Sequence, residues 1–458
     1  MIGYEYEFLV REGDKPLTKA TFLKFHEELK RRGWEQKYDH DTNGLLGSYD
    51  KDGVFVITDN GICNMEIELP PTETIAESHR RLTTLLEELQ TMYKDLGASI
   101  VGVSVFPGPS DFDHTGCADH CTASRVTAKS FIYYLVPKRR KEHHLTHLFS
   151  GIHIWLDIPT QEIMRHLLFF NRINPFLVAC FANGPILNQK LLDGLEGRNV
   201  LWMREFHSSV TSYDFKTYGM YPKEYKTIFE YLDFILDMPF SFSDRDGVSF
   251  QPKNTNTTYR EFFSMKETPA QWGHGGMFTA KPTLDDFARL HQSTFHHSRL
   301  KFFFEDDATL ATILSALKAK DSEAFLTCFR KFCVEVRTAS EQTKEEISTV
   351  PALLLGLQSN LEKAEQLVGQ YSYDFLVRLY EKAEKKGLET ELEEMKIADV
   401  CARLIAIAEE GLKQRGFGEE KYLEPLKARV VKKQNPAQEL LDIWGKEGLA
   451  GVWKARDF

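Results

Sequence analysis

Two glutamates lie two residues apart near the start of the chain, in the stretch GYEYEFLV that begins at Gly3. Side chains alternate between the two faces of a β-strand, so Glu5 and Glu7 share one face and the neighbouring aromatic side chains occupy the other. Carboxylates about 7 Å apart raise each other's pKa unless a cation lies between them. Taken alone, such a pair is more typical of the solvated face of an antiparallel sheet than of a site.

Three further stretches repeat this combination of one apolar and one charged strand face. The charged residues are Glu66 and Glu68 in MEIELPP, His153 and Asp157 in SGIHIWLDI, and Glu335 and Arg337 in FCVEVRTAS. If these strands line one sheet, its face gathers many carboxylates and an imidazole, which is unstable without cations. Oxygen-rich ligands with one imidazole suit Mg²⁺ or Mn²⁺ rather than zinc. The sequence therefore predicts a metal on this face, and hard divalent metals most often serve phosphate chemistry.

The elements that position these strands are predicted from periodicity and capping signals. Amphipathic helices are expected for TFLKFHEELKRRGW and for the segment that begins after Thr74, where Thr74 and Glu77 are expected to form a capping box. SIVGVSVF is expected to be a buried strand, and residues 205–280, which show little periodicity, are expected to be long loops.

From Pro351 to the end the apolar spacing is helical. The sequence therefore predicts an α+β fold, with a curved, mostly antiparallel sheet covered by helices and by a C-terminal helical layer. Residues 1–350 are expected to form a catalytic domain, and residues 351–458 a helical region packed on it.

Composition excludes several classes of function. The 458 residues are 42% hydrophobic and 27% charged, which is typical of a soluble globular protein, and the net charge of -10 argues against nucleic-acid and anionic-membrane partners. No apolar run has the length needed to span a membrane, and the first residues lack the pattern of a signal peptide. Seven scattered cysteines fit reduced thiols. We therefore expect a cytoplasmic protein.

Motifs spread over most of the chain resemble glutamate-cysteine ligase family 2, the plant and proteobacterial type, within the glutamine synthetase superfamily of carboxylate-amine ligases. The resemblance rests on GYEYEF, TDNGICNMEIELPP, FANGPI, GRNVLW, YLDFILDMPFSFSDRDG, PTLDDFARLHQSTFHHSRLKFF, VEVR followed by PALLLGL, and GLKQRGFGEEKYLEPLKARV. Each motif is weak alone, and the order of all of them makes the resemblance strong. It implies a glutamine synthetase-like sheet that lines a metal and ATP site.

The resemblance also implies a reaction and a set of site residues. Family members transfer the γ-phosphate of ATP to the side-chain carboxylate of glutamate, and the amine of cysteine then attacks the acyl phosphate. The implied metal ligands are Glu5, Glu7, Glu66, Glu335 and His153, and His153 is alternatively a phosphate contact. Arg198, Arg299 and Arg337 are implied as catalytic residues, and Arg198, Trp202, Arg299 and Trp155 as substrate or nucleotide contacts. In MEIELPP the family pattern aligns its acidic ligand with Glu66 and a small residue with Glu68.

Two departures from the family pattern leave details open. Residues 306–330 lengthen the path between Arg299 and Glu335, and we expect them to form a helix or helical hairpin on the surface. Glu305 is an alternative to Glu335, but Asp307 stands where its arginine should be. Trp155 stands where many relatives have a polar side chain, so a bulky indole could reshape the amine pocket.

Three alternatives remain from the sequence. The protein joins glutamate to cysteine, or it joins glutamate or another acid to a different small amine, or it is a degenerate sensor of nucleotide or glutamate; the retained acidic and arginine residues disfavour the sensor. His114, Cys117, His120 and Cys121 have a spacing compatible with zinc, although a polar loop near the substrate entrance is the preferred interpretation. The sequence leaves both a monomer and a homo-oligomer open.

Overall fold

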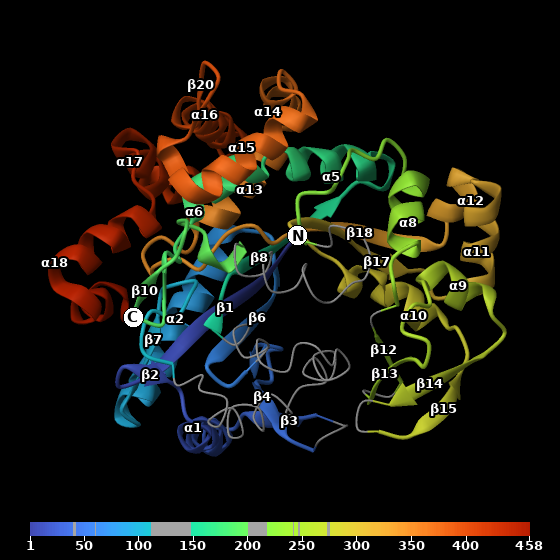
Figure 1. Ribbon diagram of the computed structural model, residues 1–458, viewed down its shortest axis with the longest axis horizontal. Coiled ribbons are helices and arrows are strands. Elements are labelled where there is room, and N and C mark those ends of the chain that lie inside the picture. The colour runs from blue at the N-terminus through green and yellow to red at the C-terminus, as the bar shows by residue number, and fades with distance from the viewer. Residues whose placement is uncertain are drawn as a thin grey trace.

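The protein is described by a computed structural model that covers residues 1–39, 43–59, 61–110, 148–199, 218–240, 242–245, 248–272 and 275–458. A large sheet crosses the middle of the molecule, and the C-terminal helices gather along one side of it (Figure 1). Within the described ranges, no helix combines the length and the apolar character that crossing a membrane requires.

The central sheet has ten strands. Eight of them follow the order β17-β18-β8-β1-β6-β5-β4-β3, while β2 and β7 also pair with β1. Their bounds are β1 Ile2–Glu12, β2 Lys15–Pro16, β3 Glu35–Tyr38, β4 Leu45–Tyr49, β5 Phe55–Thr58, β6 Asn64–Thr72, β7 Ala98–Val101, β8 Ile152–Ile158, β17 Ser298–Phe304 and β18 Phe329–Val336. All their pairings are antiparallel, which confirms the predicted sheet.

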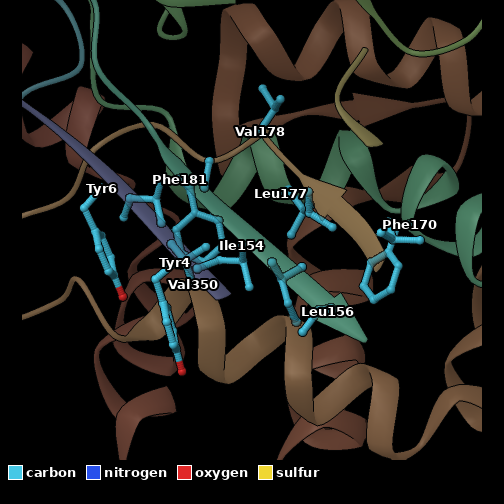
Figure 2. Close-up of a cluster of buried hydrophobic side chains, with 14 of the residues drawn as sticks. Tyr4, Tyr6, Ile154, Leu156, Phe170, Leu177, Val178, Phe181 and Val350 are labelled. Atoms are coloured by element: carbon cyan, nitrogen blue, oxygen red, sulfur yellow. The ribbon is translucent and has the colours of Figure 1, made fainter. Parts of the chain in front are cut away.

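The main core lies on the apolar face of this sheet. Tyr4 and Tyr6 of β1 and Ile154 and Leu156 of β8 are buried there, as the period of two predicts. They lie near α5 (Ile163–Arg172), α6 (Asn174–Phe181) and α13 (Thr349–Ser359), whose contributions include Phe170, Leu177, Val178, Phe181 and Val350 (Figure 2). Because the apolar side chains occupy this face, the charged side chains of the same strands share the opposite one.

The helices begin and end close to the predicted positions. Helix α1 spans Lys19–Arg31 and α2 spans Ile75–Asp95, and the Thr74 hydroxyl accepts a hydrogen bond from the Glu77 backbone N–H, which is one half of the predicted capping box. The strand expected for residues 99–106 is shorter than predicted, because β7 ends at Val101. Residues 103–106 instead form hydrogen bonds to Asn183 and Leu148.

The expectation of long loops between residues 205 and 280 was wrong for the described part of that segment. It contains β11 (Tyr218–Gly219), α8 (Ile228–Leu236), α9 (Tyr259–Ser264) and a four-stranded sheet of β12 (Ser243–Arg245), β13 (Val248–Pro252), β14 (Thr268–Trp272) and β15 (Met277–Ala280). These strands are three to five residues long, too short to display a clear period. Aromatic packing of Phe240, Phe250 and Tyr259 stabilises them instead.

The C-terminal helical layer is confirmed. After α13 come α14 (Leu361–Val368), α15 (Tyr373–Lys386), α16 (Ile397–Arg415), α17 (Glu424–Lys432) and α18 (Pro436–Arg456), with a short hairpin of β19 (Glu391–Leu392) and β20 (Met395–Lys396). Helices α13 and α16 approach so closely that a methyl group at Gly356 would clash with the Ala408 backbone. Since α13 begins at Thr349, it starts just before the predicted boundary at 350, and the division into two domains stays a prediction.

The insertion at residues 306–330 is helical, as predicted. It forms α11 (Leu310–Ala319) and α12 (Ser322–Leu326). Phe325 is fully buried, and the centroid of its ring lies 4.8 Å from that of Phe329 of β18, so the insertion packs on the end of the sheet. The other elements of the described ranges are β9 (Ile186–Leu187), β10 (Lys190–Leu191), α10 (Leu284–Ala288), β16 (Phe295–His296) and the 3₁₀ turns Thr160–Glu162, Arg289–Ser293, Gly387–Glu389 and Glu419–Leu423.

Candidate functional site

The register of the central sheet brings the predicted charged residues together on one face. Glu5 lies opposite Glu68 on β6 and opposite His153 on β8. Glu7 lies opposite Glu66. Two strands farther along, Glu335 lies between Arg299 of β17 and Trp155 of β8. Residues that are hundreds of positions apart in the sequence therefore line one continuous surface.

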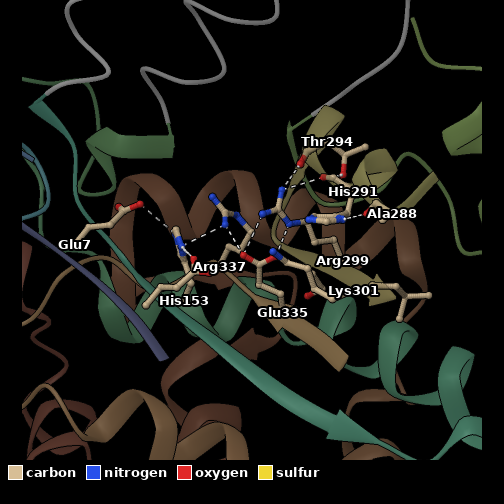
Figure 3. Close-up of polar contacts among 12 residues, drawn as sticks. Glu7, His153, Ala288, His291, Thr294, Arg299, Lys301, Glu335 and Arg337 are labelled. Atoms are coloured by element: carbon tan, nitrogen blue, oxygen red, sulfur yellow. Dashed lines mark hydrogen bonds and ion pairs between the residues drawn. The ribbon is translucent and has the colours of Figure 1, made fainter. Parts of the chain in front are cut away.

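One end of this face is rich in cations. The Glu335 carboxylate is fully buried and accepts hydrogen bonds from the Arg299 guanidinium, including one of 3.1 Å from Nη2. Arg337 Nη1 lies 2.5 Å from Oε1 and Lys301 Nζ lies 3.4 Å from Oε2 of the same carboxylate (Figure 3). Burial by itself would raise the pKa of Glu335, but these three cations hold it well below its usual range. Glu335 is thus ionised, and the cluster carries net positive charge.

Lys301 is a site residue that the sequence analysis missed. Its ammonium lies 3.9 Å from the centroid of the Trp155 ring, which makes a cation–π contact. Burial lowers the pKa of Lys301, and the nearby Glu335 opposes that effect. The signal was present in the sequence, because Lys301 follows Arg299 by two residues and therefore shares its strand face.

His153 lies in the middle of the face and contacts both acids and arginines. Its Nδ1 is 3.1 Å from Glu5 Oε2 and 3.2 Å from Arg337 Nη1, while its Nε2 is 3.0 Å from Arg198 Nη2. Burial, together with Arg337 and Arg198, lowers the pKa of His153 well below its usual value, so the imidazole is neutral. A neutral imidazole has one accepting nitrogen, so only one of the two arginines can donate to it at a time.

The other end of the face is acidic. Glu7, Asp59 and Glu66 are all buried, and each offers a carboxylate oxygen within 4.8 Å of the others. Asp59, which directly follows β5, is a second residue that the sequence analysis did not single out. Its backbone N–H donates to the carbonyl oxygen of Asn64, the first residue of β6, and the turn between β5 and β6 thus places it near Glu66. Three hard oxygen donors at this spacing fit Mg²⁺ or Mn²⁺.

The five predicted metal ligands thus divide between two groups. Glu7 and Glu66 belong to the acidic group with Asp59, whereas Glu5, His153 and Glu335 form a second group within the same 4.8 Å limit. Burial, together with the neighbouring Glu335, raises the pKa of Glu5. The second group also includes the three cations that surround Glu335, which already compensate its charge. The first group is therefore the better candidate metal centre.

Arg198 is buried beside the boundary between the two ends. Its Nη1 donates to the Arg337 carbonyl oxygen at 3.0 Å, and its Nη2 contacts His153. Across the described ranges Arg198 forms no ion pair with a carboxylate. A buried guanidinium that lacks a carboxylate partner is suited to bind an anionic ligand.

The remaining residues predicted for the site lie in different places. Trp155 lies on the site face, and its indole Nε1 is buried without a hydrogen-bond partner. Glu305, the alternative to Glu335, follows the end of β17 and belongs to neither acid group. Trp202 and the set His114, Cys117, His120 and Cys121 lie outside the described residues.

Comparison with known proteins shows which family the chain matches. The family model for glutamate-cysteine ligase family 2 matches residues 1–454. The chain is 24% identical over 305 residues to a chloroplastic glutamate–cysteine ligase of Solanum lycopersicum, a match that covers 65% of this chain and 49% of the relative. It is 23% identical over 391 residues to the chloroplastic glutamate–cysteine ligase of Nicotiana tabacum, covering 84% and 65%. The chain thus spans about half to two thirds of these relatives.

A solved structure supports the fold. The crystal structure of a glutamate–cysteine ligase from Francisella tularensis in complex with AMP superposes with a TM-score of 0.52 at 11% sequence identity. The superposition covers 99% of this chain and 86% of that chain. At this level of identity the likeness extends to the fold, which is the glutamine synthetase-like arrangement expected from the sequence.

Proposed function

Because the chain belongs to glutamate-cysteine ligase family 2, we propose that it is an ATP-dependent ligase that joins the side-chain carboxylate of glutamate to the amine of cysteine. The observation that supports this proposal is the division of one sheet face into an acidic end and a cationic end. A phosphoryl transfer to a carboxylate brings two anions together, so it requires positive charge on both sides of the reacting atoms.

The acidic end is the proposed metal centre. Glu7, Asp59 and Glu66 would hold Mg²⁺ or Mn²⁺, since each of them supplies a buried oxygen. When bound, such a metal supplies positive charge to phosphate oxygens. Glu5 and His153 lie between this end and the cations, within reach of either a metal or a phosphate.

The cationic end is proposed to bind and orient the carboxylate that is activated. Arg337 and Lys301 would stabilise negative charge that develops on the transferring phosphoryl group and the acyl oxygen. Arg299 donates to Glu335 and also to the carbonyl oxygens of His291 and Thr294, so its guanidinium orients the cluster. Arg198 is free of carboxylate contacts within the described residues and would bind an anionic group of the substrate.

The proposed reaction is tested by phosphate release from ATP in the presence of glutamate. We expect little release with glutamate alone, and rapid release when an amine acceptor is added, with cysteine the best of a panel of single amino acids and small amines. If another amine is preferred, the protein joins glutamate to a different small amine, which is the second alternative from the sequence. The Trp155 indole at the site is then the residue to examine. Release that does not depend on glutamate would contradict the proposal.

Metal dependence is a separate expectation. We expect full activity only with Mg²⁺ or Mn²⁺, because a carboxylate cluster such as Glu7, Asp59 and Glu66 cannot bind the triphosphate without a cation between them. The measurement is phosphate release after treatment with a chelator and after the metal is added back. Undiminished turnover in excess chelator would contradict it, and a Ca²⁺ control distinguishes a structural from a catalytic requirement.

The cellular location is also a proposal. Cys180, Cys328, Cys333 and Cys401 are buried thiols that form no disulfide, which supports a reducing compartment such as the cytoplasm.

A further inference from the structure

Arg198 lies at the end of a tightly packed turn. The turn pairs Glu196 with Gly184 in a parallel bridge, and the Gly197 backbone N–H donates to the Gly184 carbonyl at 3.1 Å. A side chain at Gly197 would clash with the Gly184 backbone, so the two segments can approach only because Gly197 lacks a Cβ. The backbone of the turn is therefore held in place on one side.

Glu196 connects the same turn to Ser340, in the segment that follows β18. Its carboxylate is fully buried and accepts hydrogen bonds from the Ser340 hydroxyl, with distances of 2.8 Å and 2.7 Å to its two oxygens. It also accepts a hydrogen bond from the Asn199 backbone N–H, one residue beyond Arg198. Burial raises the pKa of Glu196 to about 7, although Ser340 and Arg198 oppose this effect. A carboxyl this costly to bury requires its hydrogen bonds.

Ser340, which bonds to Glu196, also lies close to the Arg198 guanidinium through Gly151. Ser340 pairs with Gly151 in an antiparallel bridge, and a methyl group at Gly151 would come within 2.7 Å of Arg198 Cζ. The guanidinium thus lies directly on the Gly151 backbone, and from there it reaches His153 and the Arg337 carbonyl. Glu196 fixes the backbone on either side of Arg198. The segment that contains Ser340 pairs with Gly151, on which the Arg198 guanidinium lies.

We propose that Glu196 and Ser340 are positioning residues that hold the Arg198 guanidinium over Gly151, in the orientation that binds the anionic substrate. This inference rests on the proposed function for the identity of that substrate, which we take to be glutamate. The placement of Arg198 itself follows from the contacts alone.

The first test is kinetic and uses a double-mutant cycle. We expect Glu196→Ala to raise KM for glutamate about tenfold, the equivalent of about 1.4 kcal/mol, with kcat and KM for ATP changed less than about threefold. Glu196→Gln keeps an acceptor for Ser340 and is expected to restore most of the affinity. Arg198→Lys should raise the same KM, and adding Glu196→Ala to it should have little further effect, because both changes act through one guanidinium. Effects that multiply in the double variant would overturn the proposal.

The second variant approaches Arg198 from the opposite side. Gly151→Ala leaves Glu196 and Ser340 intact but places a methyl group where the guanidinium lies, and the flexible side chain can move away without unfolding the protein. We expect the same selective rise in KM for glutamate. Glu365→Ala, which breaks a partly exposed pair with Arg165 elsewhere on the surface, is the matched control and should change no kinetic constant.

A crystal structure of Glu196→Ala separates this inference from the proposed reaction. We expect the Arg198 guanidinium to leave His153 and the Arg337 carbonyl while the sheet is unchanged. If Arg198 stays in place, the positioning role is wrong whatever the substrate. If the guanidinium moves but the wild-type protein releases no phosphate with glutamate, the proposed function fails and the positioning role stands.

Discussion

Replacing Glu66 by Gln is expected to lower kcat by on the order of 10²-fold or more at saturating metal, with normal folding. Glu66 is buried on β6 opposite Glu7, and its carboxylate meets those of Glu7 and Asp59. The substitution removes one of three charged donors from the proposed metal centre while it preserves size and shape. The metal would then be held less firmly. It would stabilise the negative charge of the phosphate oxygens less in the transition state, where this stabilisation determines the rate.

Glu68 provides the matched control, since it points to the same face of the same strand. It lies opposite Glu5 and is only partly buried, and it is outside the group formed by Glu7, Asp59 and Glu66. We therefore expect Glu68→Gln to change kcat less than about threefold and to act mainly on substrate affinity. Both variants are measured by phosphate release over a range of metal concentrations, with circular dichroism to confirm the fold. If Glu68→Gln is the inactive variant, the assignment of the metal centre on β6 is wrong.

The second large effect is expected on stability and comes from Glu335→Gln. Glu335 is the only carboxylate that the described residues show in contact with Arg299, Lys301 and Arg337 together. Without its charge, the buried cations Arg299 and Lys301 and the partly buried Arg337 lose their shared partner. Breaking a buried ion pair in this way costs about 3–5 kcal/mol. We expect a lower free energy of unfolding by about that amount at neutral pH, together with loss of activity.

The control for this prediction is Glu365→Gln, the same chemical change in a partly exposed ion pair. Glu365 binds Arg165 through contacts of 2.7 to 3.0 Å, but both side chains are about one third exposed. Solvent screens that pair, so Glu365→Gln should cost no more than about 1 kcal/mol. Urea unfolding followed by circular dichroism compares the two variants with the wild type. Equal losses of stability would show that the cations around Glu335 are compensated by other groups.

Much of the fold could be predicted from local patterns. The period of two placed Glu5 and Glu7 on one face of β1 and its tyrosines on the other, because the alternation of a strand depends only on its own backbone. Thr74 began α2 for an equally local reason, since a threonine hydroxyl can accept a hydrogen bond from a backbone N–H three residues later. The C-terminal layer also follows from helical spacing, whereas the insertion was identified as a gap in the family resemblance.

The composition of the site depended on contacts between distant segments. Local alternation shows that Glu335 and Arg337 share a face, but it does not reveal that Arg299 and Lys301 lie beside them, because strand register is set by pairing across the sheet. Asp59 joins the acidic group through a turn that places it next to Glu66. The sheet of β12–β15 was not predicted from the sequence, because its strands are too short to show an alternating pattern and are stabilised by aromatic packing.

The sequence by itself therefore determined which side chains share a face within each predicted strand, and most of the chemical types that meet at the site: carboxylates, arginines and one imidazole. Only the tertiary structure decided how they divide, with Glu7, Asp59 and Glu66 at one end and the cations around Glu335 at the other. It also decided that Arg198 lies over Gly151. The physical reason is that a strand's faces follow from backbone geometry within a few residues, whereas charge compensation depends on which strands become neighbours.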